Sequence, residues 1–206
     1  MRFVPLKSVE QQDIQSLHRI RERYIHQRTQ LINQVHGLLQ EYGIISGRGQ
    51  KALKQRVWRV LEDADNELSM LMRDLIAEQM AELDRLNERI QSLDKRVELM
   101  SRTTVPCREL LAIEGVGPVV ATQLYSALGN GDAFKKGRQA SAYLGLTPKQ
   151  HSSGGTASIK GIGRTGQVSL KAALIRGAHS VINTVGDKQD AKSRWLRSLV
   201  ARVGKN

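Results

Sequence analysis

The longest uninterrupted helical pattern in the sequence runs from Glu67 to Met100, a stretch without glycine or proline. In its later part, apolar residues recur at alternating steps of three and four positions: Leu83, Leu86, Ile90, Leu93, Val97 and Met100. Such spacing averages about 3.5 residues, which keeps an apolar seam turned toward a partner helix as the two helices wind around each other. The sequence therefore predicts a long helix with coiled-coil packing along one side.

A second long amphipathic helix is predicted over residues 9–42, where apolar residues also recur every three or four positions. The Ser46–Gly49 segment separates it from a short basic helix expected over Lys51–Leu61, with Trp58 as the buried anchor. Two partners suit the seam of the 67–100 helix: the first helix, in an antiparallel hairpin, or a helix of another chain. The second arrangement would make the protein a homo-oligomer, and the spacing does not separate the two.

A glycine-containing turn between two apolar stretches follows. Residues 109–128 read Glu-Leu-Leu-Ala-Ile-Glu-Gly-Val-Gly-Pro-Val-Val-Ala-Thr-Gln-Leu-Tyr-Ser-Ala-Leu, a pattern typical of a helix-hairpin-helix motif. Gly115 and Gly117 would allow positive φ and present backbone N–H groups to a phosphate, with Pro118 at the first position of the next helix. A turn that only joins two packed helices is the other interpretation, and no Lys or Arg directly follows Pro118.

A glycine-rich segment from Gly145 to Gly166 precedes an amphipathic stretch that starts at Val168 and is expected to be helical. The segment holds six glycines and few apolar side chains. It cannot bury enough apolar surface to pack as a core element, so we expect an exposed loop carried on helices. Of the five histidines, only His151 lies beside the hydroxyl groups of this loop. If the chain has a chemical activity, this loop is where we expect it.

Helices are also predicted over Arg138–Leu144 and Lys188–Val203, the latter with Trp195 facing the core. Together these elements predict an all-α fold. Residues 1–103 would form a long coiled-coil helical hairpin. Residues 104–206 would form a small helical domain that contains the helix-hairpin-helix motif and the Gly/Ser-rich loop.

The net charge of +12 is confined to the C-terminal region. Residues 1–133 hold 18 Lys and Arg against 18 Asp and Glu, whereas residues 134–206 hold 14 against only Asp187 and Asp190. A basic excess in one region is typical of a protein that binds a polyanion, because counterion release supplies much of the affinity. A ribosome or a membrane surface is the alternative partner. The candidate nucleic-acid contacts are Gly115, Gly117, Lys149, His151, Lys160, Arg164, Lys171, Arg176, Arg194 and Arg197, with Lys171 on the solvent side of its helix.

Several other classes of protein fit the sequence poorly. The run Gly161-Ile-Gly-Arg-Thr-Gly166 matches the dinucleotide-binding glycine pattern, but no strand is expected before it and the sequence indicates no parallel sheet. No cluster of Cys and His suits zinc, and the C-terminal region has too few carboxylates to hold Mg²⁺ by itself. The single Cys107 excludes an internal disulfide framework, and no apolar run is long enough to span a membrane. We expect a cytoplasmic protein with no metal site of its own and no membrane partner.

With these motifs assembled, the chain resembles the C-terminal part of bacterial insertion-sequence transposases of the DEDD/serine type, which are related to the Piv DNA invertases. The resemblance covers essentially all 206 residues. It is carried by four stretches: Ile113–Pro118, Phe134–Pro148, the Ser153-Gly154 pair that follows His151, and Gly163–Gly166 leading into Leu170.

The resemblance implies a composite active site for DNA transposition. Ser153 would attack a DNA phosphate and hold the strand as a phosphoserine, with Ser152 as the neighbouring alternative. Mg²⁺ would be bound by the carboxylates of an N-terminal RuvC-like domain and would stabilise developing charge. A structured guide RNA would accompany the DNA as a second polyanion.

The chain departs from the family pattern at both ends. It has no RuvC-like domain before Met1-Arg-Phe-Val-Pro, and relatives continue beyond Val203-Gly-Lys-Asn206. We therefore expect a fragment that binds nucleic acid and dimerises but does not recombine DNA alone. Two other functions stay open: a non-catalytic helix-hairpin-helix DNA-binding protein, and a coiled-coil dimerisation module that regulates a full-length transposase.

Overall fold

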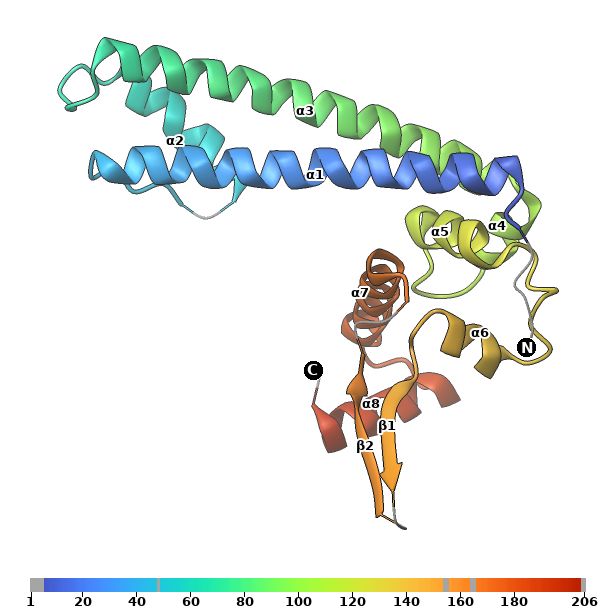
Figure 1. The fold of residues 1–206 in the computed structure, drawn as a ribbon. Helices are drawn as coiled ribbons and strands as arrows, with labels where there is room; N and C mark the ends of the chain where they lie inside the picture. Colours follow the sequence, from blue (N-terminus) through green and yellow to red (C-terminus); the bar gives the residue numbers. More distant parts are fainter. Residues whose placement is uncertain (1–5, 48, 154–155, 164–165, 205–206) are drawn as a thin grey trace. The chain divides into compact units, whose positions relative to one another are not determined.

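A computed structural model describes residues 6–47, 49–153, 156–163 and 166–204 (Figure 1). Its elements in chain order are α1 (Val9–Glu41), α2 (Gln50–Glu62), α3 (Met70–Thr103), α4 (Val105–Leu111), α5 (Pro118–Leu128), α6 (Gly137–Tyr143), β1 (Pro148–Ser153), β2 (Thr156–Ile162), α7 (Val168–Thr184) and α8 (Ala191–Val203). The predicted predominance of helix is confirmed. The two strands were not predicted.

The chain divides into two compact units, which we describe separately. The long-helix unit is Leu17–Arg96, and the C-terminal unit combines the residues up to Ser16 with those from Val97 onward. The domain boundary predicted after residue 103 stays a prediction. Across the described part of the chain, no helix combines the length and apolarity that a bilayer crossing requires.

In the long-helix unit, the apolar seam of α3 is covered by other helices of the same chain. Leu83 and Leu86 lie in one buried cluster with Leu31 and Val35 of α1. The charged flank adds an ion pair, since Arg21 Nε lies 2.5 Å from Asp94 Oδ1. In Figure 1, α1 and α3 run side by side through this unit. The seam is therefore covered without a second chain. The homo-oligomer and the coiled-coil geometry both stay predictions.

The α2 helix packs on this pair through Leu53, Val57 and Val60, which are buried. The prediction that Trp58 is the buried anchor is wrong, because its side chain is 48% exposed. The aromatic ring lies outside the stripe that the three aliphatic residues form at helical spacing. Aliphatic side chains at that spacing, rather than the bulkiest residue, fix which face of α2 is inward.

Arg73 fixes the end of α2 and the turn into α3. Its guanidinium donates to the carbonyl oxygens of Leu61 and Asp63, both at 2.8 Å, and to Asn66 Oδ1 at 2.6 Å. The last carbonyl groups of a helix have no partner within the helix, and a planar guanidinium can serve several of them at once. Arg73 therefore holds α2 in a defined orientation on α3.

His18 should make the stability of the protein depend on pH. Burial, and to a smaller extent the nearby Arg21 charge, lower the pKa of His18 from 6.5 to about 4. His18 therefore binds a proton more readily in the unfolded chain than in the folded one. The stabilisation that is present above pH 6.5 is lost as the pH falls toward 4. We expect the unfolding free energy to fall by about 2 kcal/mol between pH 7 and pH 5.

Urea unfolding at a series of pH values measures this effect. A His18→Gln variant should lose most of the pH dependence, even if its stability is lower at every pH. The matched control is His26→Gln, at an exposed position of the same helix, which should keep the dependence. An unchanged slope in His18→Gln would assign the effect to another group.

In the C-terminal unit, the start of α1 packs against α4 and α5. Ile14, Cys107, Ala121 and Tyr125 form one buried cluster. The Tyr125 hydroxyl donates to Glu10 Oε2 at 2.8 Å, and burial followed by this carboxylate raises the pKa of Tyr125 to about 12. The tyrosine therefore stays protonated and holds the first turn of α1 on α5.

A second cluster joins α5 to α7 and to the end of α6. Its buried members are Ala127, Leu144 and Leu170. Because Leu144 directly precedes the glycine-rich segment and Leu170 lies in the first turn of α7, this cluster anchors both ends of that segment. The segment between them is thereby held on a packed helical base.

Candidate nucleic-acid interface

The glycine-rich segment contains a β-hairpin, so the prediction of an irregular loop is wrong for residues 148–153 and 156–162. The strands β1 and β2 pair in antiparallel register, with His151 opposite Ser158, Ser152 opposite Ala157 and Ser153 opposite Thr156. In a two-stranded ribbon the backbone groups between the strands pair with each other and the outer groups can bind water, so it needs no apolar core, and for that reason the low apolar content did not reveal it. The Gly154-Gly155 pair between two polar runs was the available hairpin signal.

Ser153 occupies the last position of β1. Lys149, His151 and Ser153 stand at alternate positions of this strand. The side chains of residues 151–157 and of Lys160, and the whole of Arg164, lie outside the described residues. The roles assigned to Ser153, His151, Lys160 and Arg164 therefore stay predictions.

Lys149 lies at an irregularity of the hairpin. Pro148 pairs with Ile162 and Gln150 with Ile159, so the single residue Lys149 stands opposite two residues of β2. The Lys149 side chain is exposed, and its aliphatic carbons cross the face of Gly163, where an added methyl group would lie 3.1 Å from Cγ. A bulge of this kind bends a strand and redirects neighbouring side chains.

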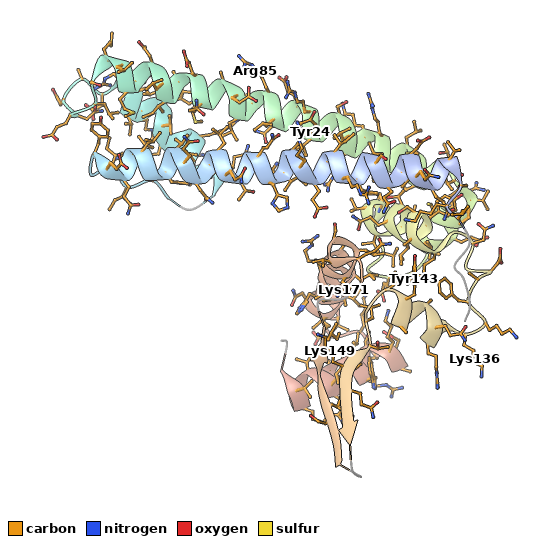
Figure 2. The ribbon with its side chains drawn as sticks, viewed as in Figure 1. Tyr24, Arg85, Lys136, Tyr143, Lys149 and Lys171 are labelled. Atoms are coloured by element: carbon orange, nitrogen blue, oxygen red, sulfur yellow. The ribbon has the colours of Figure 1, made fainter. Side chains whose placement is uncertain are left out.

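The prediction that Lys171 lies on the solvent side of α7 is wrong. Its side chain is only 6% exposed, and Nζ donates to the Gly163 carbonyl oxygen at 2.7 Å. The sequence could not show this, because the acceptor is a backbone group eight positions away. Lys149 and Lys171, labelled in Figure 2, both contact Gly163. Lys171 therefore ties the end of β2 to α7, and Lys149 is the exposed cation of the pair.

The turn between α4 and α5 packs directly on α7. Gly115 has φ +85°, and a methyl group there would lie 2.7 Å from Val181 Cγ2 and 2.8 Å from the Gly177 carbonyl oxygen. Gly177, within α7, faces the Gly115 carbonyl oxygen in return, with no room for a side chain. Gly177 was missed as a structural residue, although a glycine inside a helical pattern signals close packing.

Gly117 is the part of the turn that stays open. It is exposed and caps α5, and Pro118 takes the first position of the helix as predicted, but the φ of Gly117 is −92° and not positive as expected. Nothing lies within 4 Å of the position that a side chain would take there. The helix-hairpin-helix assignment itself stays a prediction, with Gly117 as the accessible phosphate contact and Gly115 as the packing contact.

Glu114, in the same turn, forms ion pairs with two cations, one in the α7–α8 connection and one in α8. Lys192 Nζ lies 2.6 Å from Glu114 Oε2, and Lys188 Nζ lies 3.5 Å from Oε1 of the same carboxylate. The hydrogen bond and charge of Lys192, followed by the charge of Lys188, lower the pKa of Glu114. All three side chains are solvent-exposed, so the pairs are worth little stability. Because both lysines are paired with Glu114, fewer unpaired cations remain near the N-terminal end of α8.

The remaining predicted contacts differ in how free they are. Arg176 and Arg194 are exposed. Arg197 is half-buried and donates to the carbonyl oxygens of Gly186 at 2.9 Å and Lys188 at 2.7 Å, which fixes the α7–α8 connection. The prediction that Trp195 faces the core is wrong, since its side chain is 60% exposed.

The described residues do not fit a magnesium site. They hold no group of three or more His, Cys, Asp or Glu side chains placed to share a metal ion. Asp190 is already used as the N-cap of α8, where it accepts from Ser193 N at 3.0 Å and Ser193 Oγ at 2.6 Å.

Comparison with known proteins identifies relatives along the whole chain. Residues 107–195 match the family described as Transposase IS116/IS110/IS902. The chain is 40% identical over 203 residues to a probable family 20 transposase of Pseudomonas aeruginosa, covering 98% of this chain and 60% of that protein. It is 38% identical over 206 residues to the transposase for insertion sequence element IS1111A of Coxiella burnetii, covering 100% of this chain and 57% of that protein.

A third relative is the transposase for insertion sequence element IS1328 of Yersinia enterocolitica, with 28% identity over 206 residues. The alignment covers 100% of this chain and 61% of that protein. The chain thus spans about three fifths of the length of these three relatives. It is similar in sequence to insertion-sequence transposases, and its residues 107–195 match the IS116/IS110/IS902 transposase family.

Proposed function

We propose that this chain supplies the nucleic-acid-binding and serine-bearing part of an insertion-sequence transposase of the DEDD/serine type. The observation that carries the proposal is that most of the basic excess lies inside the region that matches the family: residues 134–195 hold 11 Lys and Arg against only Asp187 and Asp190. Within that region, Arg176, Arg194 and Lys149 are exposed and available to phosphates. The relatives named as transposases support the reaction class.

In the proposed chemistry, Ser153 Oγ attacks a phosphorus atom of the DNA backbone. A new O–P bond forms to the serine while one P–O bond of the strand breaks. The departing sugar oxygen leaves as a hydroxyl group, and its added proton balances the one that the serine gives up. The phosphodiester is kept as a phosphoserine ester, so the bond energy is preserved for rejoining to another strand.

The proposal requires Lys149, His151 and Ser153 to share one face of the hairpin, as alternate positions of a strand do. Lys149 and His151 would then bind the phosphates that flank the reacting one, and Gly117 would bind a phosphate through its backbone N–H. Strand exchange is proposed for the whole protein, together with carboxylate-bound Mg²⁺ and a guide RNA. For the present chain, binding is the activity to test first.

Fluorescence anisotropy with labelled duplex DNA tests the binding surface. We expect the logarithm of affinity to fall linearly with the logarithm of salt concentration, with a slope near −0.9 per phosphate contacted. Replacing both Arg176 and Arg194 by alanine should reduce the magnitude of that slope by roughly 2. The matched control replaces Arg85 and Lys95, two exposed cations of α3, and should leave the slope nearly unchanged.

Two results would count against the proposal. One is the absence of DNA binding at low ionic strength. The other is an equal loss of slope in both double variants, which would mean that net charge alone, and not the C-terminal unit, sets the affinity.

A further inference from the structure

The exposed face of α2 combines cations with an aromatic ring. Lys51, Gln55, Arg56 and Arg59 are exposed, and Trp58 is 48% exposed. We call these five residues the α2 surface. Since Leu53, Val57 and Val60 hold the opposite side of the helix on the core of the long-helix unit, the α2 surface is directed away from that core.

The α2 surface is the source of the positive charge of its unit. Helix α2 has four basic side chains and one acidic one, whereas the rest of Leu17–Arg96 has ten basic and eleven acidic side chains. Lys54 is committed to Asp84 of α3 in an ion pair. Lys51, Arg56 and Arg59 extend from the exposed side. A local basic excess within an otherwise balanced unit is the electrostatic pattern that attracts a polyanion.

The helix that carries these residues is held in a fixed orientation. Arg73 binds its last carbonyl groups, and the Asn66 side chain donates to Val60 O at 2.6 Å. An aromatic ring on such a support does not lose much conformational entropy when a ligand stacks on it. The exposure of Trp58 is thus combined with rigidity of the backbone beneath it.

We propose that the α2 surface is a second nucleic-acid-binding site, which takes an unpaired stretch of a nucleic-acid strand. The guanidinium and ammonium groups bind phosphates, and one base stacks on the indole of Trp58. The base must be unpaired because a duplex presents phosphates on its outside but keeps the faces of its bases stacked on one another. This site lies in the other unit from Ser153 and does not depend on the function proposed above.

The two tryptophans of the chain, Trp58 and Trp195, make the test specific. In a Trp195→Phe variant of the 206-residue chain, Trp58 is the only tryptophan and its fluorescence reports on the α2 surface alone. A single-stranded oligonucleotide should quench this emission saturably at low ionic strength. Duplex DNA of equal length should quench it much less. Single-stranded DNA and single-stranded RNA, titrated in parallel, identify which strand is preferred.

Charge variants in the same Trp195→Phe background test the cations. Replacing both Arg56 and Arg59 by glutamate should raise the midpoint of quenching at least about tenfold. The control replaces Lys95 and Arg96, two exposed cations of α3, by glutamate and changes the net charge by the same amount. Its midpoint should move by less than roughly threefold, which reflects long-range charge only. Circular dichroism verifies that both variants keep their helix content.

Four outcomes would overturn the proposal. The first is no quenching of Trp58 by any single strand. The second is equal quenching by inorganic polyphosphate, which has the charge but no bases. The third is equal quenching by duplex DNA. The fourth is a doubling of molecular mass in the absence of nucleic acid, with Trp58 shielded from solvent. This result would make the α2 surface an interface between two copies of the chain.

Discussion

A Ser153→Ala variant is expected to lose the covalent protein–DNA adduct completely while it still binds DNA. The alanine removes the Ser153 oxygen that would form the proposed ester, whereas the phosphate contacts of the C-terminal unit are untouched. Loss of a nucleophile reduces turnover by roughly a thousandfold or more. DNA affinity should change less than about twofold, because one hydroxyl group contributes little to binding beside the charged phosphate contacts.

The adduct assay combines the chain with a RuvC-like domain, Mg²⁺, guide RNA and labelled element-end DNA, and detects label that stays with the protein after denaturation. The matched controls are Ser152→Ala and Ser158→Ala, which alter neighbouring hydroxyls of the same hairpin. Both should keep the adduct. If Ser153→Ala keeps it and Ser152→Ala loses it, the nucleophile is Ser152. If the adduct never forms although DNA binds, the chain is a binding protein only.

Gly115→Ala is expected to destabilise the C-terminal unit by about 3 kcal/mol. Part of this cost is the left-handed backbone at φ +85°, worth about 1 kcal/mol for a residue with a side chain. The larger part is the collision with Val181 and the Gly177 carbonyl, since overpacking a close contact costs about 1–3 kcal/mol. Urea unfolding followed by Trp195 fluorescence, in a Trp58→Phe background where Trp195 is the remaining tryptophan, measures the change in this unit.

Gly131 provides the control that separates strain from collision. Its φ is +86°, nearly the same as that of Gly115, but nothing lies within 4 Å of the side-chain position. Gly131→Ala should therefore cost only about 1 kcal/mol. Equal losses in the two variants would mean that the turn does not rest on α7 as closely as the structure indicates.

Two glycines inside helices, Gly177 and Gly37, form a second pair of variants, for which we expect changes in stability of opposite direction. Gly177→Ala should destabilise, because its methyl group meets the backbone of Gly115. Gly37→Ala, at an exposed position inside α1 with nothing within 4 Å, should stabilise its unit by up to about 1 kcal/mol through helix propensity. Stabilisation by both would contradict the packing of α7 on the turn.

The long helices could be predicted from the sequence because their signal is local. Apolar residues at steps of three and four define α1 and α3 within about one turn of their observed ends. The confinement of charge to the C-terminal region is likewise a property of the sequence alone. Burial of the aromatic residues could not be predicted from their size. Trp58 and Trp195 are large and apolar, yet each is exposed on a basic helix.

The hairpin and the role of Lys171 depend on contacts that a local pattern does not encode. The strands pair through backbone groups, so their polar side chains gave no alternation of apolar and polar positions. Lys171 is buried because the Gly163 carbonyl reaches it, which requires the chain to have already turned back onto α7. In both cases the partner is a main-chain group. Main-chain groups are nearly the same in every sequence, so the pattern of side chains does not reveal these contacts.

At Lys149, one residue of β1 stands opposite two residues of β2. The hairpin should therefore be more sensitive to changes in the length of its strands than to changes in their composition. Deleting a single residue from the second strand would restore equal numbers. Side chains alternate sides along a strand, so every position beyond the deletion would change sides relative to the helical base. Insertions or deletions in this ribbon should therefore be tolerated in pairs and rejected singly.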